Sequence, residues 1–294
     1  MSSFWSWFVA VISLGMIFAC YWLIKWTTKR RTGEAAEGDV TGHTWDGNLE
    51  EYNNPLPNWW LWLFYITIIF ALIYLVLYPG LGNFKGVLNW SSTGQYEQEM
   101  EVAQQEYGPI FARYAETGIP VLAQDDEAMA SGRRLFLNYC ATCHGSDAGG
   151  ASGFPSLKDD AWLWGGDPQA IKTSILNGRT GVMPAQAHLG DEKINDVTAY
   201  VLSLSGRDAA SGDVQSGRQV FQQNCAVCHG SDGKGQHAMG APNLTDNIWL
   251  YGGSPGVIRQ TIVNGRQGKM PAHQEFLGED KVHLLAAYVY SLSD

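Results

Sequence analysis

The sequence predicts an all-α protein in which two N-terminal transmembrane helices precede two copies of one small helical domain. Two apolar segments without charges lie near the N-terminus, and each is long enough to cross a membrane. Further along, the pentapeptide pattern C-x-x-C-H occurs twice, each time inside a longer stretch of repeated residues. Repetition over this length indicates two domains of one fold in tandem.

The first apolar segment runs from Phe4 to Ile24 and contains 21 residues without a charge. A cleavable signal peptide begins with positive charge and ends with small residues, whereas here the basic cluster Lys25, Lys29, Arg30 and Arg31 follows the segment. We therefore expect residues 1–31 to form an uncleaved transmembrane helix with a basic flank.

The second apolar segment, from Trp59 to Tyr78, predicts a transmembrane helix over residues 58–80. Tryptophans gather at its start and tyrosines toward its end, as in the aromatic belts of membrane helices. Pro57 precedes the helix and Pro79-Gly80 ends it. A buried helix of a soluble protein is the alternative, which a charge-free run of this length disfavours.

The distribution of basic residues predicts the orientation. All four Lys and Arg residues of the N-terminal part lie between the first span and residue 58, whereas only Lys85 closely follows the second span. The positive-inside rule then places the loop 32–57 in the cytoplasm and both termini on the other side. Covalent attachment of c-type haem takes place on that outer side in bacteria, which agrees with the motifs below.

Residues 81–126 are predicted to form an acidic and polar connector, with a short helix from Met100 to Ala115. Its expected role is to hold the following domains above the membrane. Those domains are expected over residues 127–206 and 207–294.

The repeat is visible as matched landmarks, with the cysteine pairs 85 residues apart and later landmarks at slightly larger offsets. Small changes of offset between fixed landmarks indicate that insertions are confined to loops. The matched pairs are Ser131-Gly132-Arg133 with Ser216-Gly217-Arg218, Pro155 with Pro242, Trp162 with Trp249, Asn177-Gly178-Arg179 with Asn264-Gly265-Arg266, Met183-Pro184 with Met270-Pro271, and Ala199-Tyr200-Val201 with Ala287-Tyr288-Val289.

The C-x-x-C-H pattern is the attachment sequence of c-type haem. Cys140 and Cys143, and in the second copy Cys225 and Cys228, would bond covalently to one porphyrin each, so the sequence predicts two haem c groups. Zinc and a thioredoxin-like redox pair are alternatives. Zinc is disfavoured because a histidine follows each pair directly and each repeat has a downstream Met-Pro, and no strand-and-helix pattern supports the redox pair.

The expected axial ligands are His144 and His229 on one side of each iron, and Met183 and Met270 on the other. The thioether of methionine suits haem iron and raises its reduction potential. Met239 is a competing ligand in the second domain without a counterpart in the first. Ligation within each domain is the default, and exchange of the two methionines between domains is the alternative. The sequence does not decide between them.

Each domain is expected to open with a helix, Glu127 to Leu137 or Val214 to Gln222, and to close with an amphipathic helix, Asp191 to Leu204 or Glu279 to Leu292. The closing helix carries an apolar stripe that is expected to pack across the opening helix. Three sets of residues flank the sites. The aromatic residues expected to wall the haem clefts are Trp162, Trp164, Trp249 and Tyr251. Two arginines, Arg179 and Arg266, are expected to pair with haem propionates or to lie in solvated turns. The remaining histidines, expected at the surface or in loops, are His188, His237, His273 and His283.

The net charge is −10, and residues from 81 onward contribute −8 of it, from 15 Lys and Arg against 23 Asp and Glu. This balance argues against a nucleic-acid partner. An acidic surface can steer a basic donor protein toward a haem edge, or can serve solubility alone.

The combined landmarks resemble the CcoP (FixP) subunits of cbb3-type cytochrome c oxidases. The resemblance covers nearly the whole chain from His43, and its signature is the stretch from His43 to Pro57 leading into Trp59-Trp60-Leu61-Trp62-Leu63-Phe64. The N-terminal span is a departure, since many members look single-spanning.

The resemblance implies a subunit in the bacterial inner membrane with periplasmic haem domains. It implies that electrons pass from a periplasmic donor cytochrome c, through the two haems, to a mono-haem cytochrome subunit and a haem–copper catalytic subunit, where oxygen is reduced and protons are pumped. The chain itself is then an electron-transfer subunit and does not reduce oxygen. Three other functions compete with it: a di-haem peroxidase, a free-standing membrane-tethered electron shuttle and a gas sensor.

Overall fold

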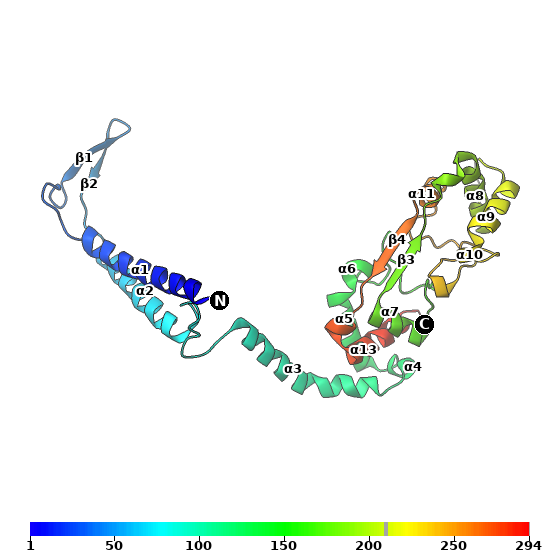
Figure 1. The fold of residues 1–294 in the computed structure, drawn as a ribbon, viewed down its shortest axis with the longest axis horizontal. Helices are drawn as coiled ribbons and strands as arrows, with labels where there is room; N and C mark the ends of the chain where they lie inside the picture. The colour runs from blue at the N-terminus through cyan, green and yellow to red at the C-terminus, as the bar shows by residue number, and fades with distance from the viewer. Residues whose placement is uncertain (209–210, 294) are drawn as a thin grey trace. The chain divides into compact units, whose positions relative to one another are not determined.

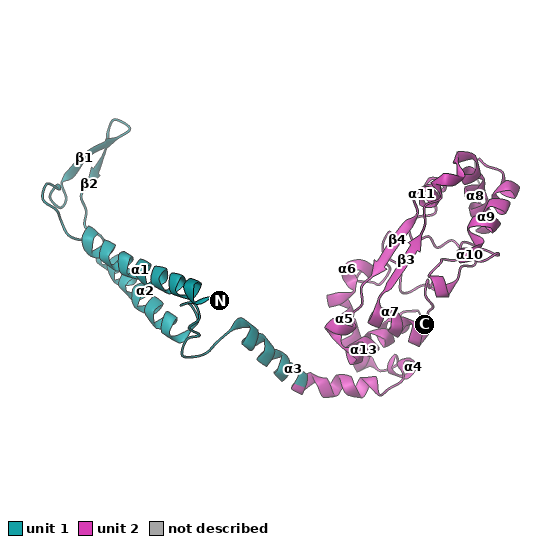
Figure 2. Ribbon diagram, in the orientation of Figure 1, with its two compact units in different colours: residues 1–104 teal, residues 105–294 magenta. Residues whose placement is uncertain are grey.

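The structure is a computed structural model that describes residues 1–208 and 211–293, in two compact units, Met1–Gln104 and Gln105–Asp294 (Figure 2). Helices dominate both units, which confirms the predicted all-α class, and two short two-stranded ladders are added to them. The elements are α1 (Ser3–Thr27), β1 (Val40–Trp45), β2 (Leu49–Tyr52), α2 (Asn58–Leu77), α3 (Ser92–Ala115), α4 (Ile119–Leu122), α5 (Asp126–Tyr139), α6 (Ala141–His144), α7 (Pro168–Asn177), β3 (Arg179–Met183), η1 (Ala187–Leu189), α8 (Asp191–Leu204), α9 (Val214–Asn224), α10 (Ala226–His229), η2 (His237–Met239), α11 (Pro255–Asn264), β4 (Arg266–Met270), α12 (Gln274–Leu277) and α13 (Glu279–Tyr290).

The first unit contains the two long apolar helices, α1 and α2, side by side (Figure 1). The rings of Tyr21 and Tyr65 lie 6.2 Å apart across the pair, and the backbone N–H of Asn83 donates to Ser6 Oγ at 2.8 Å. Within the most apolar part of each helix, only 6% of residues in α1 and none in α2 are buried. Both helices are long and apolar enough to cross a membrane, and the described part of the chain leaves their apolar surface bare.

A β-hairpin lies between these helices, where the sequence predicted only a loop. Strands β1 and β2 pair antiparallel, with Trp45 opposite Leu49 at the turn. Asp46 and Gly47 both have positive φ values in this turn. The Asp-Gly pair is a strong hairpin signal, which the sequence-based prediction did not use.

Helix α3 is longer than the predicted segment, since it begins at Ser92 instead of Met100, and it contains Pro109. Its last turn contributes Tyr114, which is buried in the second unit. Ile119 and Leu122 of α4 are buried in the same cluster, so the end of the predicted connector belongs to the folded core of the second unit.

The second unit has two apolar cores, and each core combines helices from both repeats. In the first core, α5 and α7 of the first repeat pack against α13, which closes the second repeat. In the second core, α9 and α11 of the second repeat pack against α8, which closes the first (Figure 1). The prediction that each closing helix packs across the opening helix of its own domain is therefore wrong: the two closing helices are exchanged.

Strands β3 and β4 connect the two repeats, because they form an antiparallel ladder with one strand from each. Arg179 pairs with Met270 and Met183 with Arg266, and Gly181 pairs with Gly268 at the centre. Because the register is symmetric about this central pair, the ladder relates the repeats by an approximate two-fold axis.

Two matched glycines permit the close approach of the exchanged helices. A Cβ added at Gly132 would lie 2.8 Å from Tyr288 Cβ in α13. A Cβ added at Gly217 would lie 2.0 Å from the carbonyl oxygen of Asp196 in α8. The Ser-Gly-Arg landmark of each repeat thus supplies the small residue at a helix crossing. The sequence alone displays this glycine as a repeat landmark without indicating which helix it meets.

Candidate haem-binding sites

The first C-x-x-C-H motif lies where α5 ends. Cys140 caps α5, and Ala141–His144 form the single turn α6, which stops at Gly145 with φ +80°. The His144 ring is buried, and its Nδ1 lies 2.9 Å from the carbonyl oxygen of Pro155. A carbonyl at this distance fixes Nδ1 as the N–H donor and leaves Nε2 as the free ligand atom.

The second motif repeats this geometry at the end of α9. Cys225 caps α9, α10 follows, and Gly230 has φ +78°. His229 is buried, and its Nδ1 lies 3.2 Å from the carbonyl oxygen of Pro242. Burial lowers the pKa of both His144 and His229, although the carbonyl contact opposes this shift in each case. A lowered pKa keeps each ring neutral, as a metal ligand requires.

The two cysteines and the histidine of each motif are spaced i, i+3 and i+4 around one helical turn, and this spacing brings residues to one side of a helix. Burial raises the pKa of the Cys140 and Cys225 thiols to about 11, and the neighbouring Cys143 and Cys228 add to the shift. These are not the low-pKa thiols of a redox pair. Among the described residues, no group of three or more His, Cys, Asp and Glu side chains could hold a metal ion.

The two methionines lie in the cores opposite to those expected from ligation within a domain. Met270 packs against the first core, together with Cys140 and Ala141. Met183 packs against the second core, together with Cys225 and Ala226. The competing Met239 is about half exposed, at 49%, in η2.

The close contacts at two glycines explain this placement. Gly178 and Gly265 both have φ +69°, and an added Cβ would lie 2.4 Å from the carbonyl oxygen of Met270 or Met183, respectively. Each Met-Pro segment therefore lies directly on the turn that precedes the strand of the other repeat. The Asn-Gly-Arg landmark provides the glycine that this contact needs, because neither its φ nor its space suits a side chain.

A c-type haem fits the residues present. Each site contains two cysteines and an imidazole with a free Nε2, and a methionine of the other repeat packs in the same core. Four buried side-chain atoms among the described residues lack a hydrogen-bond partner, namely Tyr114 Oη, Trp249 Nε1, His273 Nδ1 and His283 Nδ1, and Trp249 and His273 are near the two motifs' cores or Met-Pro segments. A buried N–H without an acceptor is costly, and a haem with carboxylate groups would bring acceptors into the site.

The flanking aromatic residues divide into two pairs. Trp162 packs against the first core and Trp249 against the second. Trp164 lies against Gly240 and Tyr251 against Gly153, so each of these rings contacts the other repeat.

The matched arginines also have equivalent surroundings. Arg179 Nε donates to Ser174 Oγ and its guanidinium lies 4.9 Å from the Trp164 ring centre. Arg266 donates to Thr261 Oγ1 and lies 4.5 Å from the Tyr251 ring centre. Their pairing with propionates stays a prediction.

The expectation for the remaining histidines is partly wrong. His188 and His237 are exposed as expected. His283 is instead buried in α13, with Nε2 2.8 Å from the carbonyl oxygen of Thr117. His273 is half-buried at the start of α12. His283 is buried through the exchange of the closing helices, and the sequence does not indicate that exchange.

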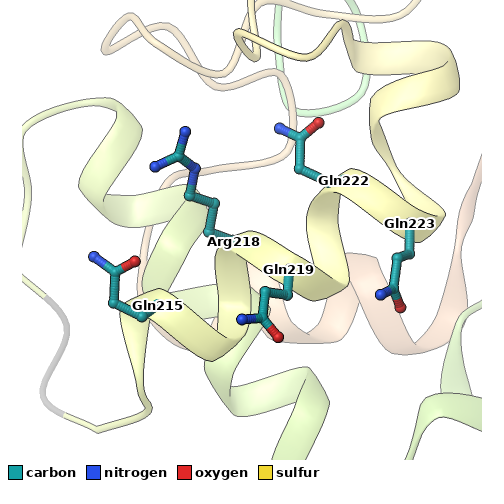
Figure 3. Close-up of a pocket in the computed structure, with 5 residues that line it drawn as sticks. All are labelled: Gln215, Arg218, Gln219, Gln222 and Gln223. Atoms are coloured by element: carbon teal, nitrogen blue, oxygen red, sulfur yellow. The ribbon is translucent and has the colours of Figure 1, made fainter.

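A shallow polar depression runs along α9, but it is not a cofactor site. Figure 3 shows side chains of this single helix around it. They are spaced as one outward helix face and include no cysteine, histidine or methionine. The lining residues are Gln215, Arg218, Gln219, Gln222 and Gln223.

The helical fold and the two C-x-x-C-H turns, each with a methionine in the same core, define the class of c-type cytochromes. Comparison with known families agrees with this class. Residues 37–85 match the family model described as the N-terminal domain of cytochrome oxidase-cbb3, FixP. Residues 127–201 and 212–289 each match the model described as cytochrome c oxidase, cbb3-type, subunit III.

Individual relatives have the same description along nearly their full lengths. The chain is 46% identical to the Cbb3-type cytochrome c oxidase subunit CcoP of Rubrivivax gelatinosus, over 99% of this chain and 96% of the relative. It is 38% identical to CcoP of Cereibacter sphaeroides (90% and 97%) and 42% identical to FixP of Azorhizobium caulinodans (86% and 92%). The chain belongs to the CcoP/FixP family of cbb3-type cytochrome c oxidase subunits.

Proposed function

We propose that this chain binds two haem c groups and relays electrons from a periplasmic donor cytochrome c toward the haem–copper subunit of a cbb3-type oxidase. The observation that carries the proposal is the pair of equivalent sites, in which a histidine lies on one side and a methionine is available for the other. An iron capped on both faces has no open position for oxygen or peroxide, which suits electron transfer and disfavours the di-haem peroxidase. When bound, each haem supplies a one-electron couple on its iron.

The residues of the chain hold and tune these groups. Cys140 and Cys143 would attach the first haem, and His144 Nε2 would bind its iron. Cys225, Cys228 and His229 would have the same roles for the second. Met183 and Met270 would supply the other iron ligands, with the exchanged pairing, because Met270 packs in the core beside Cys140 and Met183 in the core beside Cys225. Thioether ligation raises the potential of both couples.

The proposed location is the bacterial inner membrane, with α1 and α2 as two spans and the haem domains in the periplasm. The exposed apolar surface of both helices supports the spans. The basic residues between the spans support a cytoplasmic loop. A reporter enzyme that is active only outside the cytoplasm should be active when fused after residue 294 and inactive when inserted at Gly47. Activity at Gly47 would contradict this orientation.

The proposed partners are the haem–copper catalytic subunit, the mono-haem cytochrome subunit and the donor cytochrome c. The family membership and the bare α1–α2 surface support subunit contacts within the membrane. Purification in mild detergent should yield a complex that contains these subunits and consumes oxygen with reduced cytochrome c. A monomeric particle would instead support the free-standing shuttle.

Double variants test the ligand assignment without removing a domain. In His144→Ala/Met270→Ala, the exchanged pairing places both changes at one iron, so the other haem should keep its methionine–iron charge-transfer band and exclude carbon monoxide. The matched variant His144→Ala/Met183→Ala should damage both haems. The reverse outcome would show ligation within each repeat. If both charge-transfer bands persist in every variant, or if the mass of the wild-type protein lacks two haems, the proposed function itself is contradicted.

A further inference from the structure

The two haem-binding sites differ at one residue of an otherwise equivalent segment. The segments are Met183-Pro184-Ala185-Gln186 and Met270-Pro271-Ala272-His273. The backbones of the last residues match, with φ −112° at Gln186 and −114° at His273. Their N–H groups donate to equivalent carbonyl oxygens, at 2.9 Å to Ile262 and at 3.0 Å to Ile175. The difference between the sites is therefore confined to the side chain.

These two side chains have different partners. The Gln186 amide donates to the carbonyl oxygen of Pro184 at 3.3 Å, within its own segment. The Nδ1 atom of His273 is shielded from solvent and has no hydrogen-bond partner among the described residues. A buried ring nitrogen without a partner is destabilising, so its retention calls for a partner that the folded chain alone does not supply.

The position of His273 indicates where that partner lies. Its backbone N–H donates to the carbonyl oxygen of Ile175, which is buried in the first core. His273 also lies three residues after Met270, which packs beside Cys140 in the first core. At the second site the matched residue, Gln186, follows Met183, which packs beside Cys225. The unpartnered nitrogen therefore belongs to the first haem site.

We infer that His273 is a positioning residue of the haem attached to Cys140 and Cys143, and that its Nδ1–H donates to an acceptor that the bound haem completes there. The inference rests on the proposed function. Two acceptors have the required chemistry, the thioether sulfur of Met270 and a propionate oxygen. A hydrogen bond to either withdraws electron density or offsets negative charge, so it favours the reduced iron. The two haems are thereby made inequivalent, with the first shifted toward a higher potential than its surroundings would otherwise give.

Exchange of the two side chains tests this inference. In His273→Gln, one of the two midpoint potentials should fall, by an amount equal to a roughly two- to tenfold change in the reduction equilibrium, as expected for one hydrogen bond. The other potential, the haem content and the exclusion of carbon monoxide should be unchanged. His273→Asn places an amide N–H at about the position of Nδ1, whereas the amide of Gln lies one bond further out, so His273→Asn should recover part of the shift. Gln186→His provides the matched control at the second site.

Spectra distinguish the two acceptors, and they separate a failure of this inference from a failure of the proposed function. If Met270 Sδ accepts, His273→Gln should also change the methionine–iron charge-transfer band and the electron paramagnetic resonance signal of one ferric haem. If a propionate accepts, the band stays and only the potential moves. Unchanged potentials in His273→Gln, or an equal shift of both, would overturn the inference while leaving the proposed function intact. Absence of bound haem in the wild-type protein would overturn the proposed function instead.

Discussion

The ring of Phe136 packs against the ring of Tyr288 at a centroid separation of 5.4 Å, although the two residues belong to different repeats. The equivalent pair, Phe221 and Tyr200, lies at 5.2 Å. In both pairs the phenylalanine comes from the helix before a C-x-x-C-H turn and the tyrosine from the closing helix of the other repeat. Each haem-binding site therefore depends on a helix that a single repeat does not contain.

Truncation of the phenylalanine should be strongly destabilising. Phe136 is fully buried, and Phe136→Ala should lower the free energy of unfolding by about 3–5 kcal/mol. Phe221→Ala should have a similar effect. Denaturant titration of the detergent-solubilised protein measures both. Val121→Ala removes a side chain that is 66% exposed and should change stability by less than about 0.5 kcal/mol. A similar loss in all three variants would contradict the assigned core.

The exchange of closing helices predicts which region each core mutation loosens. Leu284 of α13 is fully buried in the first core, so Leu284→Ala should increase hydrogen exchange in α5 and α7. Val197 of α8 is buried in the second core, so Val197→Ala should act on α9 and α11. Mass spectrometry of exchanged peptides resolves these segments. Loosening of α9 by Leu284→Ala, with α5 unaffected, would mean that each repeat closes on itself.

The glycine at the α8–α9 crossing should not tolerate a side chain. A Cβ at Gly217 would lie 2.0 Å from the Asp196 carbonyl oxygen, so Gly217→Ala must separate the helices and should cost at least about 1–3 kcal/mol. Gly256 in α11 provides a matched control, because nothing lies within 4 Å of its added Cβ. Gly256→Ala should be neutral or stabilising by up to about 1 kcal/mol. Thermal unfolding compares the two, and equal midpoints would refute the close crossing.

Asp196 predicts a pH dependence of stability in acid. Hydrogen bonds from the Ser216 side chain and from the Asp213 N–H, the latter at 2.8 Å, lower the pKa of this carboxyl. A lowered folded-state pKa means that the stabilisation is present above the unfolded-state pKa of about 4 and is lost as the pH falls through the folded value. Asp196→Asn should therefore be less stable than wild type at pH 7, and the difference should shrink by pH 3. Denaturant titrations at both values check this, and a pH-independent difference would rule it out.

Local signals in the sequence accounted for most of the helices. The predicted helix Asp191 to Leu204 coincides with α8, and the two apolar segments coincide with α1 and α2 to within three residues. These elements were predictable because hydrophobic periodicity, length and end signals are properties of contiguous residues. The β-hairpin was missed although its Asp-Gly turn carried a local signal.

The proposed haem-binding residues are four cysteines that attach the porphyrins and two histidines and two methionines that ligate the irons. The sequence by itself identified all eight as candidates, because attachment chemistry and repeat spacing identify residue types along the chain. It left open whether each methionine packs in the core of its own C-x-x-C-H motif or of the other, and it misassigned the partners of the closing helices. Only the tertiary structure decided these, through the β3–β4 ladder and the glycine contacts beneath each Met-Pro segment. The physical reason is symmetry: two equivalent repeats present the same apolar stripe and the same crossing glycine. Local pattern therefore cannot distinguish a helix that returns to its own repeat from one that packs on the other.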